Sequence, residues 1–262
     1  MVIQSPVMNV MVAAAEKAAR SLRRDFGEIE NLQVSSKGPG DFVSNADLKA
    51  EKTLFEELSR ARPGYGFLME ENGTIEGQDK THRWIIDPLD GTTNFLHGIP
   101  HFAISIGLER DGVLVAGLIY NPVTDEVYHA ERGTGAYLNN KRIRVSARSK
   151  MSESLLATGI PHQGRSYPEK FMKDMDTLMP KVAGIRRFGS AALDLAYVAA
   201  GRLDGYWDRA LEPWDMAAGV VIVREAGGMV SDINLSGKFM ESGNILAANE
   251  ATYDALGKCL ER

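Results

Sequence analysis

Trp-Ile-Ile-Asp-Pro-Leu-Asp-Gly-Thr-Thr-Asn-Phe, residues 84–95, is the most informative stretch of this 262-residue chain. An apolar run ends in two aspartates three positions apart, followed by a glycine and two hydroxyl-bearing residues. The proline after Asp87 biases that residue toward an extended backbone and fixes the turn. Two carboxylates held this close repel each other unless a cation lies between them. Ligand sets made only of oxygen suit Mg²⁺ or Mn²⁺.

The residues after the second aspartate are suited to binding an anion. Gly91 lets backbone N–H groups approach closely, and Thr92 adds a hydroxyl group. A cation site beside an anion-binding loop is typical of phosphoryl chemistry. The alternative is a surface turn, because Asp-Pro and Asp-Gly are ordinary turn dipeptides. This stretch alone leaves both interpretations open.

The composition is that of a globular protein, with 44% hydrophobic and 25% charged residues. The length allows one large domain or two intimate subdomains with a substantial core. A net charge of −5 does not indicate nucleic-acid or membrane binding through general electrostatics. Residues 141–150 contain a basic cluster, for which a solvated face is favoured over a binding patch.

Cysteine and histidine usage excludes two kinds of site. Cys259 is the only cysteine, so no internal disulfide can form, and a reducing cytoplasm fits. The five histidines show no paired ligand spacing, which argues against a zinc site. Residues 1–20 have neither the basic start nor the long apolar core of a signal peptide or membrane span.

Apolar periodicity predicts mixed α and β structure with antiparallel hairpins. Helices are expected at residues 7–26, 45–62 (with Asn45 as N-cap), 168–179, 190–201, 215–226 and 250–261. Strands are expected at 66–69, 83–86, 102–109, 113–120, 126–131, 136–138, 155–158, 205–207, 229–231 and 244–248, and a loop at 35–40. We expect two packed subdomains, 1–150 and 151–262, in a single compact catalytic unit.

Further acidic residues stand at the ends of predicted elements. Glu70 and Glu71 follow an apolar strand, and since neighbouring strand residues point to opposite faces, one of them should enter a site. Asp215 stands at the start of a helix rich in small residues. Asp41 and Asp47 flank a short apolar stretch. Each has an alternative interpretation. The two glutamates would be an exposed pair, Asp215 a stabilising first-turn aspartate, and Asp41 and Asp47 loop or helix-cap residues.

Taken together, these motifs resemble the inositol monophosphatase family over nearly the whole chain. Residues 41–47 resemble its early acidic motif, and residues 70–71 its Glu-Glu site. Residues 84–95 match the pattern Trp-x-Ile-Asp-Pro-Leu-Asp-Gly-Thr-x-Asn-Phe, and residues 214–228 match Trp-Asp-x-Ala-Ala-Gly running into Glu-Ala-Gly-Gly. The fold that this resemblance implies is α+β, a layered αβαβα sandwich shared with fructose-1,6-bisphosphatases.

The resemblance also implies a set of metal ligands. Glu70, Asp87 and the carbonyl of Leu89 would hold a first Mg²⁺ ion, and Asp87, Asp90 and Asp215 a second. A third, weaker ion would lean on Glu70, and Mn²⁺ is a possible substitute. Residues 1–150 would then carry most of the ligands, while residues 151–262 supply Asp215 and substrate contacts.

The catalytic roles come from the same resemblance. Gly91 and Thr92 would bind the phosphate through backbone N–H groups, beside Asp90. Thr92, paired with Asp47, would orient the attacking water, and Glu70 would belong to the catalytic group through its metal. The implied reaction is in-line attack of a metal-activated water on a phosphomonoester, without a covalent intermediate.

Substrate specificity rests on fewer residues. Gly189, Ser190, Ala191 and Asp208 align with positions that face inositol in the family. The carboxylate of Asp208 would hydrogen-bond polyol hydroxyls; the alternative is an exposed turn acid beside Arg209. The expected reaction is hydrolysis of inositol-1-phosphate to inositol and phosphate. Histidinol-phosphatase, fructose-1,6-bisphosphatase and 3′-phosphoadenosine nucleotidase activities are the rivals within the superfamily.

Partners and location follow from the resemblance as well. It implies a lithium-sensitive cytoplasmic hydrolase that forms a homodimer and binds neither membranes nor nucleic acid directly. An interpretation from another class is a non-catalytic role in RNA-polymerase-associated complexes, since some bacterial relatives act there. The intact ligand set argues against loss of catalysis. The sequence leaves open the physiological substrate, the number of metals bound at rest and the dimer interface.

Overall fold

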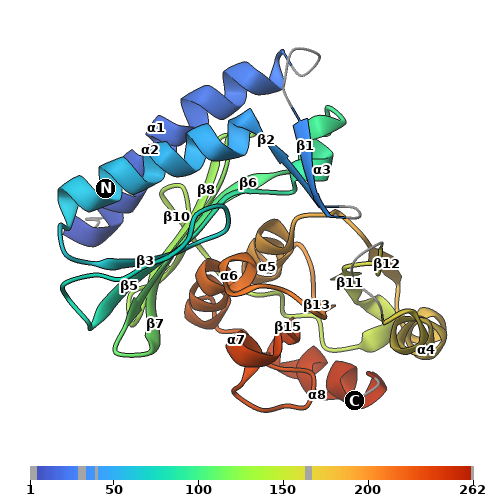
Figure 1. Ribbon diagram of the computed structural model, residues 1–262. Helices are drawn as coiled ribbons and strands as arrows, with labels where there is room; N and C mark the ends of the chain where they lie inside the picture. Colours follow the sequence, from blue (N-terminus) through green and yellow to red (C-terminus); the bar gives the residue numbers. More distant parts are fainter. Residues whose placement is uncertain (1–4, 29–33, 39–40, 163–166, 261–262) are drawn as a thin grey trace.

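The computed structural model describes residues 5–28, 34–38, 41–162 and 167–260. Its elements form five layers in which helices and sheets alternate (Figure 1). The predicted αβαβα sandwich is therefore confirmed. In the described part of the chain, no helix is long and apolar enough to cross a membrane.

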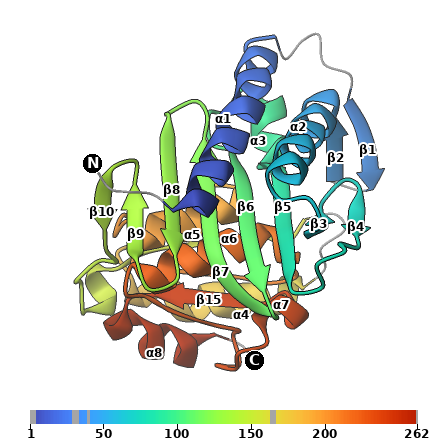
Figure 2. The ribbon, with the colours of Figure 1, turned by 90° about the vertical axis from the view of Figure 1, so that its left-hand side faces the viewer.

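The first layer consists of α1 (Pro6–Phe26) and α2 (Asn45–Ala61), which lie across the outer face of the larger sheet (Figure 2). Both helices were expected at nearly these bounds. The N-cap of α2 is Ser44 and not Asn45, because the Ser44 hydroxyl accepts a hydrogen bond from the N–H of Ala46 at 3.1 Å. The N-cap hydroxyl satisfies a backbone donor that the helix itself cannot pair.

The larger sheet has eight strands in the order β10-β9-β8-β7-β6-β5-β3-β4. Their bounds are β3 (Gly66–Met69), β4 (Gly73–Ile75), β5 (His82–Asp90), β6 (Ala103–Arg110), β7 (Val113–Asn121), β8 (Glu126–Glu131), β9 (Gly135–Leu138) and β10 (Lys141–Ile143). β3 and β5 are parallel, and the other pairs are antiparallel. The short strands β4 and β10 were not predicted; pairing with β3 and β9 defines them.

Strand β5 runs beyond the predicted residues 83–86 and includes both aspartates of the opening motif. Its pairing with β6 shifts register between Asp87, opposite Ser105, and Asp90, opposite Ala103. Pro88 lies in this irregularity and has no N–H to contribute to the ladder. The aspartates thus stand at an irregular strand end inside the fold, and the interpretation as an ordinary surface turn is wrong.

The predicted loop at residues 35–40 is only partly tested, because residues 39 and 40 lie outside the described residues. For the rest the prediction is wrong: β1 (Val34–Gly38) pairs antiparallel with β2 (Asp41–Ser44). The sequence of these strands is rich in polar residues and shows no apolar alternation. Pairing between the two strands defines them. The short helix α3 (Thr92–Leu96) was also missed.

The middle layer holds α5 (Ala191–Ala199) and α6 (Pro213–Glu225). α6 packs so closely on the larger sheet that a Cβ atom on Gly117 would lie 2.4 Å from the Ala218 carbonyl oxygen. Glycine on the strand and alanines on the helix permit this approach. α6 begins two residues before the predicted 215, so Asp215 is the third helical residue and lies in the first turn.

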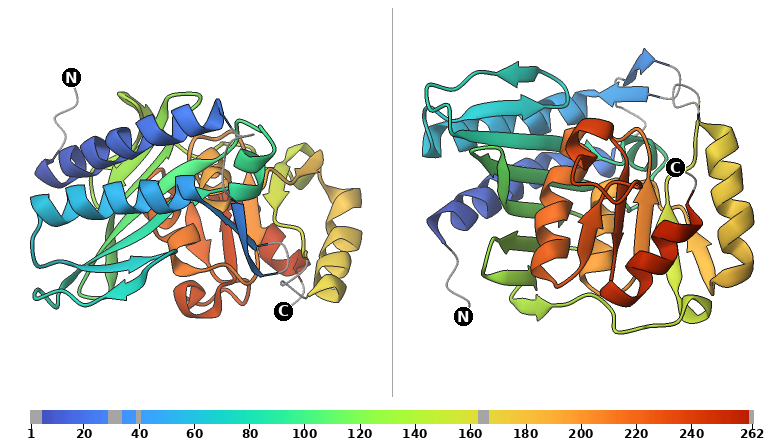
Figure 3. Two further views of the ribbon diagram at one scale, coloured as in Figure 1. Left: turned by 45° about the horizontal axis from the view of Figure 1, so that its top comes forward. Right: turned by 90° about the horizontal axis from the view of Figure 1, so that it is seen from below.

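The smaller sheet has five strands in the order β12-β11-β13-β15-β14. They are β11 (Leu155–Thr158), β12 (Gly184–Arg186), β13 (Gly205–Asp208), β14 (Met229–Ser231) and β15 (Ile245–Ala248). The outer helices are α4 (Pro168–Leu178) and α8 (Glu250–Cys259), the latter seen in red against these strands in Figure 3. The short helix α7 (Phe239–Ser242) precedes β15. Three apolar clusters fill the spaces between the layers.

Candidate metal centre

Three buried carboxylates meet where β5 ends and α6 begins. Asp87, Asp90 and Asp215 each place a carboxylate oxygen within 4.8 Å of the other two. Their exposed fractions are 2%, 9% and 8%. Asp215 lies in the first turn of α6, where the partial positive charge of the helix end stabilises an anion. The three side chains expected to hold a second ion thus lie together, although Asp215 is more than 120 positions from the two others in the chain.

Glu70 joins this group from the neighbouring strand. β3 runs parallel to β5, and the N–H of Glu70 donates to the carbonyl of Ile86 at 3.2 Å, beside Asp87. The carboxyl group of Glu70 lies close enough to that of Asp87 to act on its pKa. Burial raises the pKa of Asp87 well above its ordinary value, and the nearby charges of Glu70, Asp90 and Asp215 raise it further.

This group of four carboxyl groups fits a divalent cation. All its side-chain donors are oxygen atoms, the ligand type that Mg²⁺ and Mn²⁺ prefer. Four carboxylates gathered in one place, three of them buried, are unfavourable by themselves, as the raised pKa of Asp87 indicates. Two divalent cations would neutralise four carboxylates and reverse this penalty. The residues present therefore fit the metal that the family resemblance implies.

Thr92 and Asp47 lie together, as predicted. The Thr92 hydroxyl oxygen is 3.1 Å from Oδ1 of Asp47 and 3.1 Å from the Leu89 carbonyl oxygen. Asp47 is itself held by Ser44, whose N–H and hydroxyl group donate to Oδ2 at 2.8 and 2.5 Å. Burial raises the pKa of Asp47, although these hydrogen bonds oppose the shift. Ser44 was missed, but the Ser-x-x-Asp spacing of a capping box signals it.

Gly91 has the backbone conformation that the anion-binding interpretation requires. Its φ angle of 98° is left-handed, and a Cβ atom there would lie 3.1 Å from the His101 carbonyl oxygen. Thr92 then opens the short helix α3. A left-handed residue followed by helical ones makes a concave run of backbone N–H groups that suits an anion.

The predicted residues Gly189, Ser190 and Ala191 lie at the start of α5, next to Asp90. The Ser190 hydroxyl and the N–H of Ala192 both donate to Oδ2 of Asp90, the latter at 2.8 Å. The start of α5 therefore fixes the orientation of a proposed metal ligand, a role that the sequence did not reveal. Contact between these residues and a substrate stays a prediction.

Asp208 is buried, with 6% of its surface exposed, so its interpretation as an exposed turn acid is wrong. Its Oδ2 accepts from the hydroxyl group of Tyr206 at 2.8 Å, and its Oδ1 from the N–H of Arg209 at 2.7 Å. A Cβ atom on Gly159 would lie 2.2 Å from this carboxylate. The side chain of Arg209 is turned to a different acid and forms a buried ion pair with Asp174.

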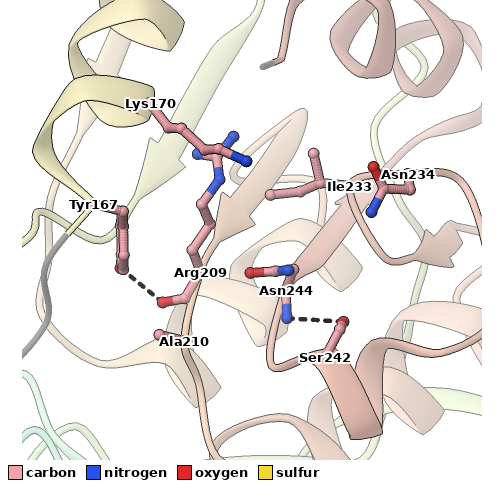
Figure 4. A pocket seen from close by; sticks show the side chains of 8 residues that line it. All are labelled: Tyr167, Lys170, Arg209, Ala210, Ile233, Asn234, Ser242 and Asn244. Atoms are coloured by element: carbon pink, nitrogen blue, oxygen red, sulfur yellow. Dashed lines mark hydrogen bonds between the residues drawn. The ribbon is translucent and has the colours of Figure 1, made fainter. Parts of the chain in front are cut away.

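A cavity of about 270 Å³ lies beyond Tyr167, whose hydroxyl group donates to the Arg209 carbonyl at 2.7 Å (Figure 4). It is lined by Tyr167, Lys170, Arg209, Ala210, Ile233, Asn234, Ser242 and Asn244. None of these residues belongs to the group of four carboxyl groups.

The sequences of known proteins match this chain over nearly their whole length. A sequence model of the inositol monophosphatase family matches residues 3–261. The chain is 58% identical to an inositol-1-monophosphatase of Mesorhizobium japonicum over 99% of this chain and 97% of that protein. It is 44% identical to a Nus factor SuhB of Vibrio cholerae, over 96% of this chain and 94% of that protein.

A solved structure agrees with these sequence matches. The crystal structure of extragenic suppressor protein suhB from Bartonella henselae superposes with a TM-score of 0.95 at 57% identity, covering 98% of this chain and 99% of that chain. The resemblance, the sandwich fold and the phosphatase class predicted from the sequence are confirmed. The chain belongs to the inositol monophosphatase family.

Proposed function

We propose that this protein is a Mg²⁺-dependent phosphomonoesterase that hydrolyses inositol-1-phosphate to inositol and phosphate. The observation that carries the proposal is the buried group Asp87, Asp90 and Asp215, with Glu70 close enough to act on the pKa of Asp87. With the carbonyl of Leu89, these residues would hold the two to three ions that the resemblance implies. When bound, Mg²⁺ lowers the pKa of a coordinated water and offsets the charge of a phosphate group.

The remaining site residues supply binding and proton transfer. The backbone N–H groups of Gly91 and Thr92 would bind the phosphate oxygens. The Thr92 hydroxyl donates to Asp47, so its oxygen lone pairs are free to accept a proton from a water beside it. Asp47, with its raised pKa, is suited to receive a proton through Thr92. We therefore assign orientation and deprotonation of the attacking water to this pair.

We also propose that residues 1–150 and 151–262 form one catalytic unit that neither part completes alone. Asp215 comes from the second part, and the start of α5 holds Asp90 of the first through Ser190 and Ala192. Separating the two parts would remove one proposed ligand and release another.

Substitution of Asp208 is expected to separate substrate recognition from chemistry. Because Asp208 is assigned to polyol hydroxyls and not to the metals, Asp208→Ala should raise KM for inositol-1-phosphate by roughly tenfold or more, a typical cost of one hydrogen bond to a charged group. KM for a small aryl phosphate should change much less. Steady-state kinetics with both substrates measure this. Equal effects would assign Asp208 to structure or to catalysis.

A substrate panel tests the proposed specificity. Phosphate release in Mg²⁺ is compared for inositol-1-phosphate, histidinol phosphate, fructose-1,6-bisphosphate and 3′-phosphoadenosine 5′-phosphate. The highest kcat/KM is expected for inositol-1-phosphate. A clear preference for another ester would contradict the proposed substrate and assign that activity instead. The proposed metal centre would not be affected by this result.

Lithium is expected to inhibit at concentrations at which sodium does not. Li⁺ is similar in size to Mg²⁺ but carries half the charge, so it would occupy the site of Asp87, Asp90 and Asp215 without replacing the function of Mg²⁺. Inhibition should be uncompetitive or mixed with respect to substrate, and excess Mg²⁺ should change it. Initial rates in LiCl and matched NaCl measure the effect. Identical rates in the two salts would contradict a tight second site.

The resemblance further supports Mg²⁺ as the physiological ion with Mn²⁺ as a substitute, a homodimer, and a cytoplasmic location. The single cysteine is compatible with that location. Light scattering coupled to gel filtration tests the dimer, and cell fractionation tests the location.

A second candidate function is a Nus-factor role alongside catalysis. Its support is the relatives named Nus factor SuhB, which are 41% to 44% identical to this chain. The basic cluster is exposed on β10 and the segment after it, although Arg148 pairs with Asp204 and Lys150 with Glu153. Co-purification with RNA polymerase from cells, compared between the native protein and Asp87→Asn, would show whether such a role exists apart from catalysis.

A further inference from the structure

We propose that Glu51 is a positioning residue for the metal ligand Glu70, a role that rests on the function proposed above. Glu51 lies on α2 one helical turn after Asp47, so both carboxylates share one face of the helix. Its side chain is fully buried, with 0% of the residue exposed. A buried carboxylate requires hydrogen-bond donors to replace its lost water, and the identity of these donors indicates what Glu51 does.

The donors all come from the turn after β3. Oε2 of Glu51 accepts from the N–H of Glu71 at 2.8 Å. Oε1 accepts from the N–H of Asn72 at 3.0 Å and from its side-chain amide at 2.5 Å. One carboxylate thus fixes two consecutive residues of the turn, and Glu70 is the residue immediately before them.

As a result, the peptide groups on both sides of Glu70 are held. The N–H of Glu70 is bonded to the Ile86 carbonyl of β5, the strand that carries Asp87. The next N–H, that of Glu71, is bonded to Glu51. Because peptide groups are planar, fixing both restrains φ and ψ of Glu70 and sets the direction of its Cα–Cβ bond. Glu51 therefore ties the helix of Asp47 to the backbone that directs Glu70 toward Asp87.

A purely structural role is the competing explanation, and it makes a different prediction. If Glu51 only stabilises the turn between β3 and β4, its replacement lowers the melting temperature and leaves Mg²⁺ affinity unchanged. If it positions Glu70, its replacement weakens metal binding, because partners that orient metal ligands typically change metal affinity by about 10- to 100-fold. Metal affinity therefore separates the two explanations.

Glu51→Gln is the informative substitution. The amide keeps the shape of the side chain but places an NH₂ group opposite a backbone N–H, so at least one of the three hydrogen bonds is lost. Calorimetry of the substrate-free, full-length protein should show a Kd for Mg²⁺ raised by about tenfold or more. The Mg²⁺ concentration for half-maximal phosphate release should rise in parallel, with kcat at saturating Mg²⁺ within about threefold of the native value.

Asn72→Ala is the matched control. It removes the side-chain donor to Glu51 but keeps both backbone hydrogen bonds, so the peptide after Glu70 stays fixed. Its Kd for Mg²⁺ should stay within about twofold of the native value. If Glu51→Gln does not fold, Glu51→Asp replaces it, since the shorter carboxylate keeps the charge but reaches the turn poorly, and a raised Kd is again expected.

The outcomes distinguish this proposal from the metal centre itself. An unchanged Kd in the folded Glu51 variant, or an equal rise in Asn72→Ala, overturns the positioning role. Glu70→Gln serves as the reference for direct loss of a ligand. Native protein that binds no Mg²⁺, or Glu70→Gln that binds it normally, contradicts the proposed metal centre. Weak binding by Glu70→Gln with a normal Kd in Glu51→Gln contradicts only the role of Glu51.

Discussion

Asp87→Asn should lose activity by at least about a thousandfold in kcat, the cost of removing a main electrostatic stabiliser of a reaction. Asp87 is the most buried of the three clustered aspartates, and the charges of Glu70, Asp90 and Asp215 all raise its pKa. In the proposed mechanism Asp87 would help to hold both cations, and a neutral amide cannot provide the same charge. The measurement is kcat for inositol-1-phosphate at saturating Mg²⁺.

The same variant should be at least as stable as the native protein when metal is absent. In the native protein, the pKa of Asp87 in the folded state is raised above the ordinary value of 3.8. Around this carboxyl group the folded native protein therefore binds more protons than the unfolded chain. The contribution of Asp87 to stability therefore falls as pH rises above about 3.8, until the folded pKa is passed. In EDTA, the melting temperature of Asp87→Asn relative to native protein should increase with pH across this window.

Addition of Mg²⁺ should reverse the order of the two melting temperatures, because a ligand that binds only the folded state stabilises that state. The native protein should melt higher in Mg²⁺, and Asp87→Asn should respond little. Asp111→Asn is the matched control, since Asp111 is exposed in the hairpin between β6 and β7 with a left-handed φ of 51° that asparagine tolerates. Near-native kcat in Asp87→Asn would show that its carboxylate is no part of the reaction.

Thr92→Val should lower kcat by about 100-fold or more while Mg²⁺ binding persists, the usual range for loss of a group in proton transfer. Valine keeps the branched shape but cannot donate to Asp47 or to the Leu89 carbonyl, the two contacts of the Thr92 hydroxyl. Thr92→Ser restores the hydroxyl group and should recover most of the activity. Calorimetry with Mg²⁺ and steady-state kinetics together measure the separation. A Thr92→Val enzyme with near-native kcat would remove Thr92 from the chemistry.

Much of the fold and of the candidate site could be predicted from the sequence, because the motifs that carry the proposed metal ligands lie at the end of a strand and at the start of a helix. The apolar residues before Asp87 predicted a strand, the small residues after Asp215 predicted a closely packed helix, and both are confirmed. The metal-ligand motifs also mark the ends of these elements. The same residues therefore predict both the metal ligands and where these elements begin or end.

The features that sequence reasoning missed depend on contacts between distant residues. Polar residues of β1 form a strand only because β2 supplies the hydrogen bonds. The hydroxyl group of Ser190 is aligned with a substrate position, yet it donates to Asp90, 100 residues away. For Asp208 the sequence left a polyol contact and an exposed turn acid beside Arg209 both open; burial next to Gly159 and a hydrogen bond from Tyr206 exclude the second. Periodicity carries no information about such pairings.

Phosphate release from inositol-1-phosphate before and after metal removal tests the central claim most directly, namely that the buried carboxylates are a divalent metal centre for phosphomonoester hydrolysis. Native protein and Asp87→Asn are dialysed against EDTA and assayed before and after Mg²⁺ is added back. The native protein should release no phosphate in chelator and regain full turnover with Mg²⁺, while Asp87→Asn stays inactive in both. Turnover by the native protein that persists in the chelated sample would contradict the account.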